Sequence, residues 1–350
     1  MTKRSTSRSD VAIIGAGPAG LSLARSLAGI GLDVVIVEKL QEKVLAAPPM
    51  DGRDIALTHL SIEILKELDV WRRFPARAIS PIKEARVLDG QSPYFLLFDH
   101  NDTDKTALGY IVSNHLIRKA LYESLEDFAN IRLITDVTAE AVSTDTTGGS
   151  VRVSNGQTIT ALLIVAADSR FSEVRRKMGI SAAMNDFGRV VIVCRMKHDR
   201  PHDDIAYECF HYKRTLAVLP LGGNTSSVVV TLPADMSEAL MAMDKNAFNT
   251  DIQHRFGDRL GRMELVGKRY LYPLVGVHAN RFTAQRFALI GDAAVGMHPV
   301  TAHGFNLGLR GQNTLARNIR WALDRDLDIG GPGVLDDYHA VHSRVTWPLY

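Results

Sequence analysis

The stretch Asp10–Lys39, DVAIIGAGPAGLSLARSLAGIGLDVVIVEK, decides the fold. It opens with an unbroken apolar run, Val11–Ile14, of the kind that a strand buried on both faces requires. A glycine-rich turn follows, and apolar residues then recur at helical spacing until glycines end the helix. A second apolar run, Val34–Val37, ends in Glu38. The pattern predicts a strand, a turn, a helix and a second strand that finishes in an acid.

The turn has the form G-x-G-x-x-G, with glycines at Gly15, Gly17 and Gly20. In this form the first glycine makes the tight turn, the second lets the backbone approach a pyrophosphate, and the third lets the helix pack on the strand. The helix N-terminus adds unpaired N–H groups and the positive end of a dipole. Glu38 stands where a carboxylate accepts hydrogen bonds from ribose hydroxyls. These features predict a dinucleotide site, since a plain glycine-rich turn would explain neither the spacing nor the acid.

A second strand-turn-helix signal, Ala288–Gly311, indicates which dinucleotide binds. Its apolar strand leads into Gly291-Asp292, and a strand-end aspartate can accept hydrogen bonds from polyol hydroxyls. The backbone of Gly304–Asn306, at a helix start, can donate N–H groups to an electron-rich ring edge. A cofactor that spans both strand ends needs a sugar-alcohol chain and a flat ring, which predicts FAD. We expect it to be non-covalent, because no attachment cysteine or histidine pattern is evident.

Composition narrows the class of protein. The chain has 350 residues, 46% of them hydrophobic, which suits a soluble globular protein. A formal net charge of +2 and the lack of a Lys/Arg block argue against nucleic-acid binding. Cys194 and Cys209 show no C-x-x-C spacing, so we expect buried free thiols. No secretory signal and no run of 18 apolar residues is present, and metal binding is not expected.

The apolar runs predict two intertwined parts. An α/β, Rossmann-type FAD-binding domain is expected to be discontinuous, over residues 1–75, 103–186 and 273–350. An inserted substrate domain of β-sheet plus helix is expected over residues 76–102 and 187–272, with one long helix at Ser237–Phe256. Within the first domain, Ile131–Ile134 is expected to join Ala139–Ser143 and Val151–Val153 in a small antiparallel ribbon.

Three of these stretches together resemble a known family. Gly15–Leu21, Asp168 after Ala166-Ala167, and GDAAVGMHPVTAHGFNLGL are similar to the class A FAD-dependent aromatic monooxygenases. The likeness is strongest to the ubiquinone-biosynthesis hydroxylases, whose last motif is typically G-[DN]-A-A-x-x-x-H-P-x-x-x-x-G-x-N-x-G. The form T-A-H-G-F-N resembles the demethoxyubiquinol 5-hydroxylases among them.

The resemblance assigns roles to residues of this sequence. It implies that Glu38 binds the adenosine ribose, Asp292 the ribityl chain, and Val137 the adenine through its backbone. Arg53 would lie along the cofactor, and Arg118 would reach its pyrophosphate or ribityl region. Asp168 would serve both flavin and nicotinamide binding, and Pro299 would line the isoalloxazine. The full set of predicted FAD-binding residues is Gly15, Gly17, Pro18, Ala19, Gly20, Glu38, Lys39, Arg53, Arg118, Val137, Asp168, Gly291, Asp292, Pro299, Gly304, Phe305 and Asn306.

Two departures from the family pattern stand out. Ser169 replaces the usual glycine after Asp168, where a side chain would restrict the backbone from positive φ. Family members also usually continue past Tyr350, so the resemblance implies a further C-terminal helix beyond this sequence, and we expect that helix to meet membrane or partner proteins.

The implied activity is hydroxylation of an activated phenol. NAD(P)H or another transient donor would reduce FAD, O₂ would add to form a flavin C4a-hydroperoxide, and this would deliver oxygen to the ring. No catalytic base can be named from the sequence. Two alternatives stay open: an FAD-dependent lipid reductase or oxidase without oxygen insertion, and a non-catalytic, flavin-stabilised subunit of a biosynthetic complex.

The predicted substrate is lipophilic. Arg195, Arg214 and Arg269 are scattered among apolar runs, so no clamp for a carboxylate is visible. A polyprenylated phenol or quinol fits better, because each buried CH₂ of its tail contributes ~0.8 kcal/mol. We therefore expect a cytoplasmic enzyme that contacts the inner face of the membrane peripherally, with O₂ as co-substrate and a biosynthetic complex as a further partner.

Overall fold

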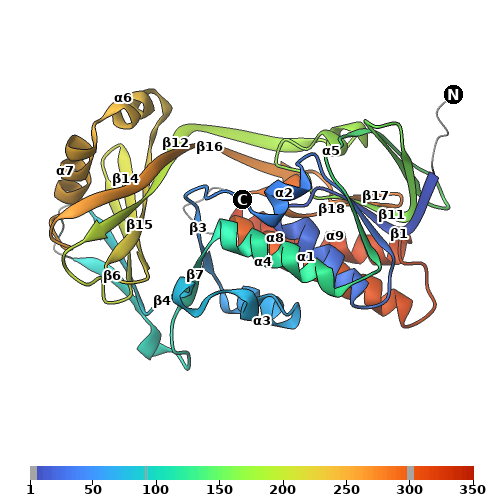
Figure 1. Cartoon of the computed structure of the whole chain (residues 1–350), viewed down its shortest axis with the longest axis horizontal. Coiled ribbons are helices and arrows are strands. Elements are labelled where there is room, and N and C mark those ends of the chain that lie inside the picture. Colours follow the sequence, from blue (N-terminus) through green and yellow to red (C-terminus); the bar gives the residue numbers. More distant parts are fainter. Residues whose placement is uncertain (1–5, 91, 93, 298–302) are drawn as a thin grey trace.

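In the computed structural model, residues 6–90, 92, 94–297 and 303–350 are described. A parallel sheet forms one half of the molecule (Figure 1). Its strands are β18 (Phe287–Leu289), β11 (Thr158–Ala166), β1 (Thr6–Ile14), β2 (Val34–Val37) and β8 (Ile131–Ile134), in that spatial order. The short β17 (Thr283–Ala284) extends the β18 edge in the antiparallel direction.

Helices cover this sheet because its central strands are apolar on both faces. The residues of β2 are all buried, as are Val11–Ile14 of β1, so each face needs a covering layer. The cover comes from α1 (Pro18–Ala28), α4 (Asn114–Glu123), α8 (His303–Leu323) and α9 (Pro332–Thr346), with α1 packed against α8 and α4. The resulting core combines side chains from residues 11–180 with side chains from residues 279–338.

A second, largely antiparallel sheet forms the other half. Its spatial order is β19 (Val295–Gly296), β16 (Met263–Ala279), β12 (Ala182–His198), β15 (Thr225–Pro233), β14 (Arg214–Leu221), β13 (Ile205–His211), β5 (Glu84–Asp89) and β6 (Phe95–Asp99). The two 17-residue strands β12 and β16 run from one half to the other (Figure 1). One face packs on α6 (Ser237–Ala242) and α7 (Lys245–Arg255) around a core of its own.

A three-stranded sheet lies between the halves. It contains β3 (Asp54–Leu57), β7 (Gly109–Ser113) and β4 (Ser80–Ile82). Its Ile82 and Ile111 meet Ala206 and Leu221 of the second sheet in a small apolar cluster. The remaining elements are α2 (Glu42–Ala46), α3 (His59–Glu67), α5 (Glu173–Lys177) and the hairpin of β9 (Ala139–Thr144) with β10 (Gly149–Val153).

The mixed α/β architecture that the sequence predicts is confirmed, and two local expectations are wrong. Ile131–Ile134 does not join the antiparallel ribbon but pairs in parallel with β2, because α4 carries the chain across to the open edge of that strand. Ser237–Phe256 is not one helix, since α6 ends at Ala242. The carboxylate of Asp244 then caps a new helix by accepting hydrogen bonds from the N–H groups of Asn246 and Ala247. Cys194 and Cys209 are buried free thiols, as expected.

Candidate active site

The carboxyl ends of four parallel strands bring the predicted cofactor residues to one edge of the first sheet. Gly15 follows β1, Glu38 follows β2, Asp168 lies two residues beyond β11, and Gly291 lies two residues beyond β18. Ligands of open α/β folds bind at this edge. The edge therefore defines the candidate cofactor site.

The glycine-rich turn leaves space only at its middle glycine. Gly15 has φ +112°, and a Cβ there would lie 2.4 Å from the carbonyl oxygen of Ala167. A Cβ on Gly20 would lie 2.0 Å from the carbonyl oxygen of Gly15. A Cβ on Gly17 would meet no atom within 4 Å, and α1 begins there without a side-chain cap. The turn thus presents an open cradle lined by unpaired N–H groups, which fits a pyrophosphate. Pro18 and Ala19 form the first turn of α1 behind it.

Glu38 is buried and holds the turn in place. Its Oε2 accepts a hydrogen bond from the N–H of Ala16 at 2.6 Å, and its Oε1 accepts one from the N–H of Leu40 at 2.9 Å. An ionised carboxylate offers about four acceptor sites, so two remain for ribose hydroxyls. The N–H of Val137 donates a hydrogen bond to the carbonyl oxygen of Glu38 at 3.2 Å. The backbone group of Val137 that remains for contact with an adenine is therefore its carbonyl. Lys39 is exposed beside them.

The ends of β11 and β18 contribute an unpaired acceptor and an ion pair. Among the described residues, Oδ1 of Asp168 is buried without a hydrogen-bond partner. A buried acceptor of this kind fits a ligand that brings a donor, such as a flavin or a sugar hydroxyl. Asp292 pairs with Arg170 at 3.1 Å and stays partly exposed. Ser169 is absent from the residues with positive φ, so the replacement of glycine causes no strain in this conformation.

The buried side chain of Arg175 connects these two strand ends through hydrogen bonds. Arg175 is 2% exposed and donates from Nη1 to the carbonyl oxygens of Ala293 and Arg170. Burial lowers the pKa of Arg175, and the charge of Asp168 opposes that shift. The loop after β11 and the loop after β18 are therefore held at a fixed separation.

The N-terminus of α8 completes the edge. The N–H groups in the first turn of a helix have no partner within the helix, and a Cβ on Gly304 would meet no atom within 4 Å. The side chain of Asn306 binds other parts of the protein: Oδ1 accepts a hydrogen bond from Ser61 Oγ at 2.7 Å, and Nδ2 donates one to the carbonyl oxygen of Ala56 at 2.9 Å. It anchors α8 to β3 and α3, while Phe305 packs partly into the core. Pro299 lies outside the described residues.

Arg53 lies at the junction of the two halves. It pairs with Asp51 at 2.6 Å, and its guanidinium lies 5.4 Å from the centre of the Tyr272 ring. Burial alone would raise the pKa of Asp51, but Arg53 and a hydrogen bond from Asn114 outweigh it and lower that pKa. Arg118 lies one helical turn after Asn114 and is half-buried, and its side chain makes no hydrogen bond or ion pair to any described residue. Residues i and i+4 share a helix face, so Arg118 lies on the side of α4 that meets this junction.

A set of contacts that the sequence did not predict fixes the position of the second sheet. The carboxylate of Asp54 is 0% exposed and pairs with Arg195 of β12 at 2.6 Å. Arg195 also donates to Ser113 Oγ at 2.6 Å. Asp54 follows Arg53 directly in the segment DGRD, yet its partner lies 141 residues away. No spacing within the sequence signals such a contact.

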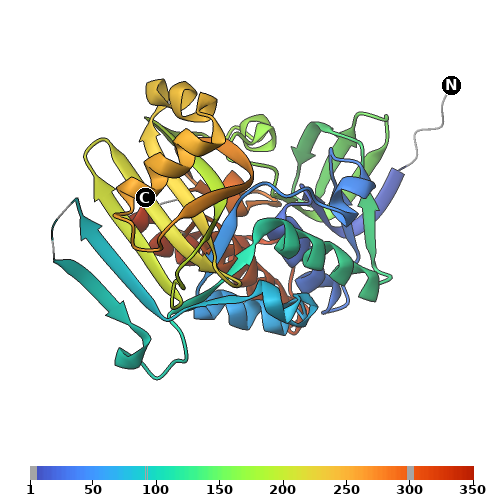
Figure 2. The same cartoon turned by 60° about the vertical axis from the view of Figure 1, so that its left-hand side comes forward.

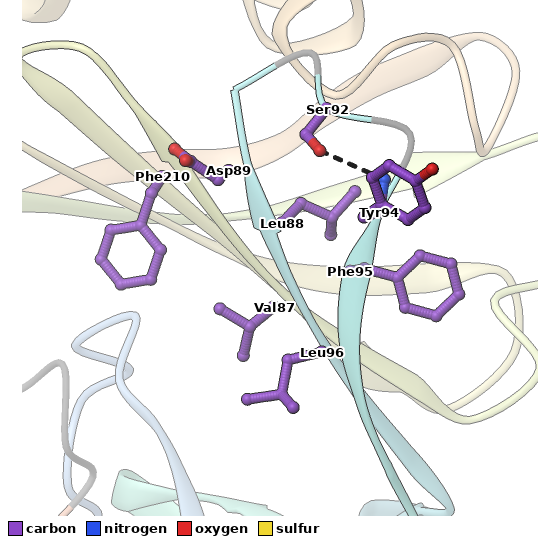
Figure 3. A pocket seen from close by; sticks show the side chains of 8 residues that line it. All are labelled: Val87, Leu88, Asp89, Ser92, Tyr94, Phe95, Leu96 and Phe210. Atoms are coloured by element: carbon purple, nitrogen blue, oxygen red, sulfur yellow. Dashed lines mark hydrogen bonds between the residues drawn. The ribbon is translucent and has the colours of Figure 1, made fainter.

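A second surface feature lies at the far edge of the second sheet. Figure 3 shows a groove between β5, β6 and the end of β13. Its lining residues are Val87, Leu88, Asp89, Ser92, Tyr94, Phe95, Leu96 and Phe210. Side chains of β6 point out on both faces of the strand, and Tyr94–Phe98 are each 45–83% exposed. The β5–β6 hairpin stands at the outer limit of the molecule in Figure 2 (cyan).

The described ranges contain no helix long and apolar enough to cross a membrane. They also contain no cluster of three or more His, Cys, Asp or Glu side chains that would hold a metal ion.

The uncapped α1, the open cradle at Gly17 and the acids at the strand ends define a class of protein, the FAD-binding flavoproteins. The chain belongs to the family described as "FAD binding domain", which matches residues 8–350. It is an FAD-dependent monooxygenase, and NAD(P)H is the usual reductant of this class.

Relatives with known names share most of the chain. Ubiquinone hydroxylase UbiM of Neisseria meningitidis is 45% identical over 98% of this chain and 75% of its own length. Ubiquinone hydroxylase UbiL of Rhodospirillum rubrum is 37% identical over 95% of this chain and 77% of its own length. The 3-demethoxyubiquinol 3-hydroxylase of Escherichia coli is 27% identical over 87% of this chain and 78% of its own length.

Solved structures show the same fold. PqsL of Pseudomonas aeruginosa, in complex with 2-aminobenzoylacetate, superposes with a TM-score of 0.81 at 20% identity, over 98% of this chain and 94% of that one. The flavin-dependent monooxygenase PieE, in complex with FAD and substrate, gives 0.78 at 18% identity, over 98% of this chain and 63% of that one.

Proposed function

We propose that the protein hydroxylates the aromatic ring of a polyprenylated phenol or quinol in ubiquinone biosynthesis. The names of the UbiM and UbiL relatives support the substrate class. The observation that carries the proposal is that the arginines of the second sheet are already paired with other groups. This sheet faces the cofactor edge, where Tyr272 contacts Arg53. None of the three arginines that the sequence singled out is available to hold a small anionic substrate.

Each of those arginines already has a partner. Arg195 pairs with Asp54, and Arg214 pairs with Asp251 at 2.6 Å. Arg269 donates to the carbonyl oxygens of Leu240 and Met243 and lies over the Phe248 ring. Recognition of a carboxylate would need a free fork of guanidinium donors. A neutral ring that is held through the burial of an apolar tail needs none.

The residues at the cofactor edge would then bind different parts of FAD. The cradle at Gly17 and the N-terminus of α1 would bind the pyrophosphate, Glu38 the ribose, and Asp168 with Asp292 the hydroxyl-bearing middle of FAD. The chemistry that FAD supplies when bound is acceptance of a hydride from NAD(P)H, followed by activation of O₂ for insertion into the ring. The N-terminus of α8 would stabilise negative charge at the pyrimidine end of the reduced ring. The second sheet would position the substrate and exclude water.

Isotope labelling tests the proposal against its alternatives. The FAD-loaded chain is given NAD(P)H, a prenylated phenol and ¹⁸O₂, and the products are read by mass spectrometry. One labelled oxygen in the ring is expected. An oxidised or reduced lipid without label would instead support a reductase or oxidase, and no product at all would support a non-catalytic subunit.

We further propose that the protein works at a membrane surface, with β6 as its point of contact. Apolar side chains exposed on both faces of an edge strand are rare in proteins that meet only water. Residues 76–102 carry three basic and four acidic side chains, so lipid charge would contribute little. Neutral vesicles should therefore carry the chain in a flotation assay, and Leu96→Asp/Leu97→Asp should release it. Equal flotation of both proteins would contradict the proposal.

The division into an FAD-binding part and a substrate part stays a prediction. The two separate cores support it.

A further inference from the structure

One face of the second sheet is covered by α6 and α7. The other face, which we call the open face, carries no such helices among the described residues and turns toward the three-stranded sheet and the cofactor half. On β13, Ile205, Tyr207 and Cys209 point into the core beneath α6 and α7. Side chains alternate along a strand, so Ala206, Glu208 and Phe210 point to the open face. The same face meets the cofactor half, because Arg195 and Tyr272 lie on it and contact Asp54 and Asp51.

Strand register places Glu208 in a row that leads to the cofactor edge. The row runs across five strands from β13 and comprises Glu208, Ala217, Val229, Val193 and Tyr270, each the direct partner of the next. It ends at Gly52, where a Cβ would lie 2.4 Å from the Tyr270 ring and 3.0 Å from Val193. Gly52 is the neighbour of Arg53. Three strand spacings of ~4.8 Å put Glu208 about 14 Å from Val193.

Glu208 is the carboxylate of this row, and nothing in the described structure holds it. Its side chain makes no hydrogen bond or ion pair to any described residue, whereas the side chains of Asp54 and Asp251 both pair with arginines. Its direct neighbours are Val87 on β5 and Ala217 on β14, both without polar groups. Burial raises the pKa of Glu208 to about 7. An ionisable side chain with a shifted pKa and no partner in the protein is a candidate for contact with a ligand.

The carboxylate is also accessible. Its oxygen atoms are not among the sealed, unpartnered atoms of the described residues. Val87, its partner on β5, lines the groove of Figure 3 and so opens this end of the row to the surface.

We propose that Glu208 binds a ring hydroxyl of the substrate and so selects phenols and quinols over their ethers. This inference rests on the proposed function, because it assumes that the open face takes an aromatic ring. The carboxylate would accept a hydrogen bond from the hydroxyl on the side of the ring turned away from the flavin. The apolar row would contact the ring itself.

The test compares a prenylated phenol with its methyl ether on the FAD-loaded full chain. Binding is read from the change in flavin absorbance during titration. The wild type should prefer the phenol by about ten- to a hundredfold, the value of one charge-assisted hydrogen bond. Glu208→Leu should bind both compounds alike, and Glu208→Gln should lie between. An unchanged preference in both variants would overturn the assignment.

A matched control and a second readout separate the possible failures. Glu264→Gln alters another carboxylate of the same sheet, one that pairs with Arg262 at 3.3 Å, and should keep the wild-type preference. Retained flavin absorbance shows that each variant is folded. If the wild type inserts oxygen into the phenol while the Glu208 variants keep its preference, the Glu208 assignment alone fails. If the wild type neither binds nor hydroxylates a prenylated phenol, both proposals fail.

Discussion

The carboxyl edge of the parallel sheet and the open face of the second sheet recognise molecules in different ways. At the edge, polar groups stand directly after strands, and the backbone would provide much of the proposed recognition, through the N-terminus of α1, the N-terminus of α8 and the turn at Gly17. On the open face, the proposed recognition would depend on side chains of separate strands, such as Glu208, Ala217 and Val193. The edge is thus encoded in short segments, and the face only in the assembled sheet.

The difference has a physical origin. A pyrophosphate needs N–H groups and open space, and one turn of six residues supplies both. A substituted ring needs apolar contact over its area and one correctly placed polar group. Only neighbouring strands in a defined register can provide that arrangement. A site of the second kind can therefore change its substrate through one side chain.

The largest expected effect is a difference between substitutions at Gly17 and Gly20 of the cofactor turn. Gly17→Ala places its Cβ in open space at a backbone φ of −74°, so the free energy of unfolding without FAD should fall by less than about 1 kcal/mol. The same methyl group would stand where the pyrophosphate is expected. We expect FAD affinity to fall by about a hundredfold or more, equal to ~2.7 kcal/mol. Flavin fluorescence titration and urea unfolding measure the two quantities.

Gly20→Ala is the matched control, because it adds the same methyl group where protein atoms already stand. The Cβ would lie 2.0 Å from the carbonyl oxygen of Gly15, and backbone cannot yield as a side chain does. The free energy of unfolding without FAD should therefore be lower than that of the wild type by on the order of 3 kcal/mol. If Gly17→Ala lowers stability as much as Gly20→Ala, or leaves FAD affinity unchanged, the cradle at Gly17 is not a ligand site.

The same contrast explains what the sequence could reveal. Gly15–Gly20, Glu38 and Asp292 were predictable because each lies within a few residues of a strand end in a recognisable segment. The side-chain role of Asn306 was not, since its partners Ser61 and Ala56 lie about 250 residues away in the chain. The pairing of Ile131–Ile134 was misjudged for a related reason. A short apolar strand carries no mark of whether its partner is local or reached through a crossover helix.

The smallest expected effect is a pair of opposite pH dependences, one from each region. His342 packs behind the cofactor edge, where its ring stacks on Tyr338 at 5.6 Å and borders Gly311 of α8. Burial, with smaller contributions from Arg310 and His278, lowers the pKa of His342 to about 4. The unfolded chain, with a histidine pKa of about 6.5, then binds more protons than the folded chain between pH 4 and 6.5. Stability should therefore be lost as the pH falls through this range, by roughly 1–2 kcal/mol at pH 5.

Glu208 should act in the other direction. Its folded pKa of about 7 lies above the ordinary value of 4.5, so the folded chain binds the extra proton between these values. Ionisation in the folded state is the costly step, and stability should fall as the pH rises from 4.5 to 7, by roughly 2 kcal/mol. Urea unfolding of the FAD-loaded protein from pH 5 to 8 measures both slopes. The free energy of unfolding of each variant is compared with that of the wild type at the same pH. The difference, variant minus wild type, should be most positive at pH 5 for His342→Gln and at pH 8 for Glu208→Gln. If Glu208→Gln gives the same difference at both pH values, Glu208 titrates normally and the open face is wetter than its register implies.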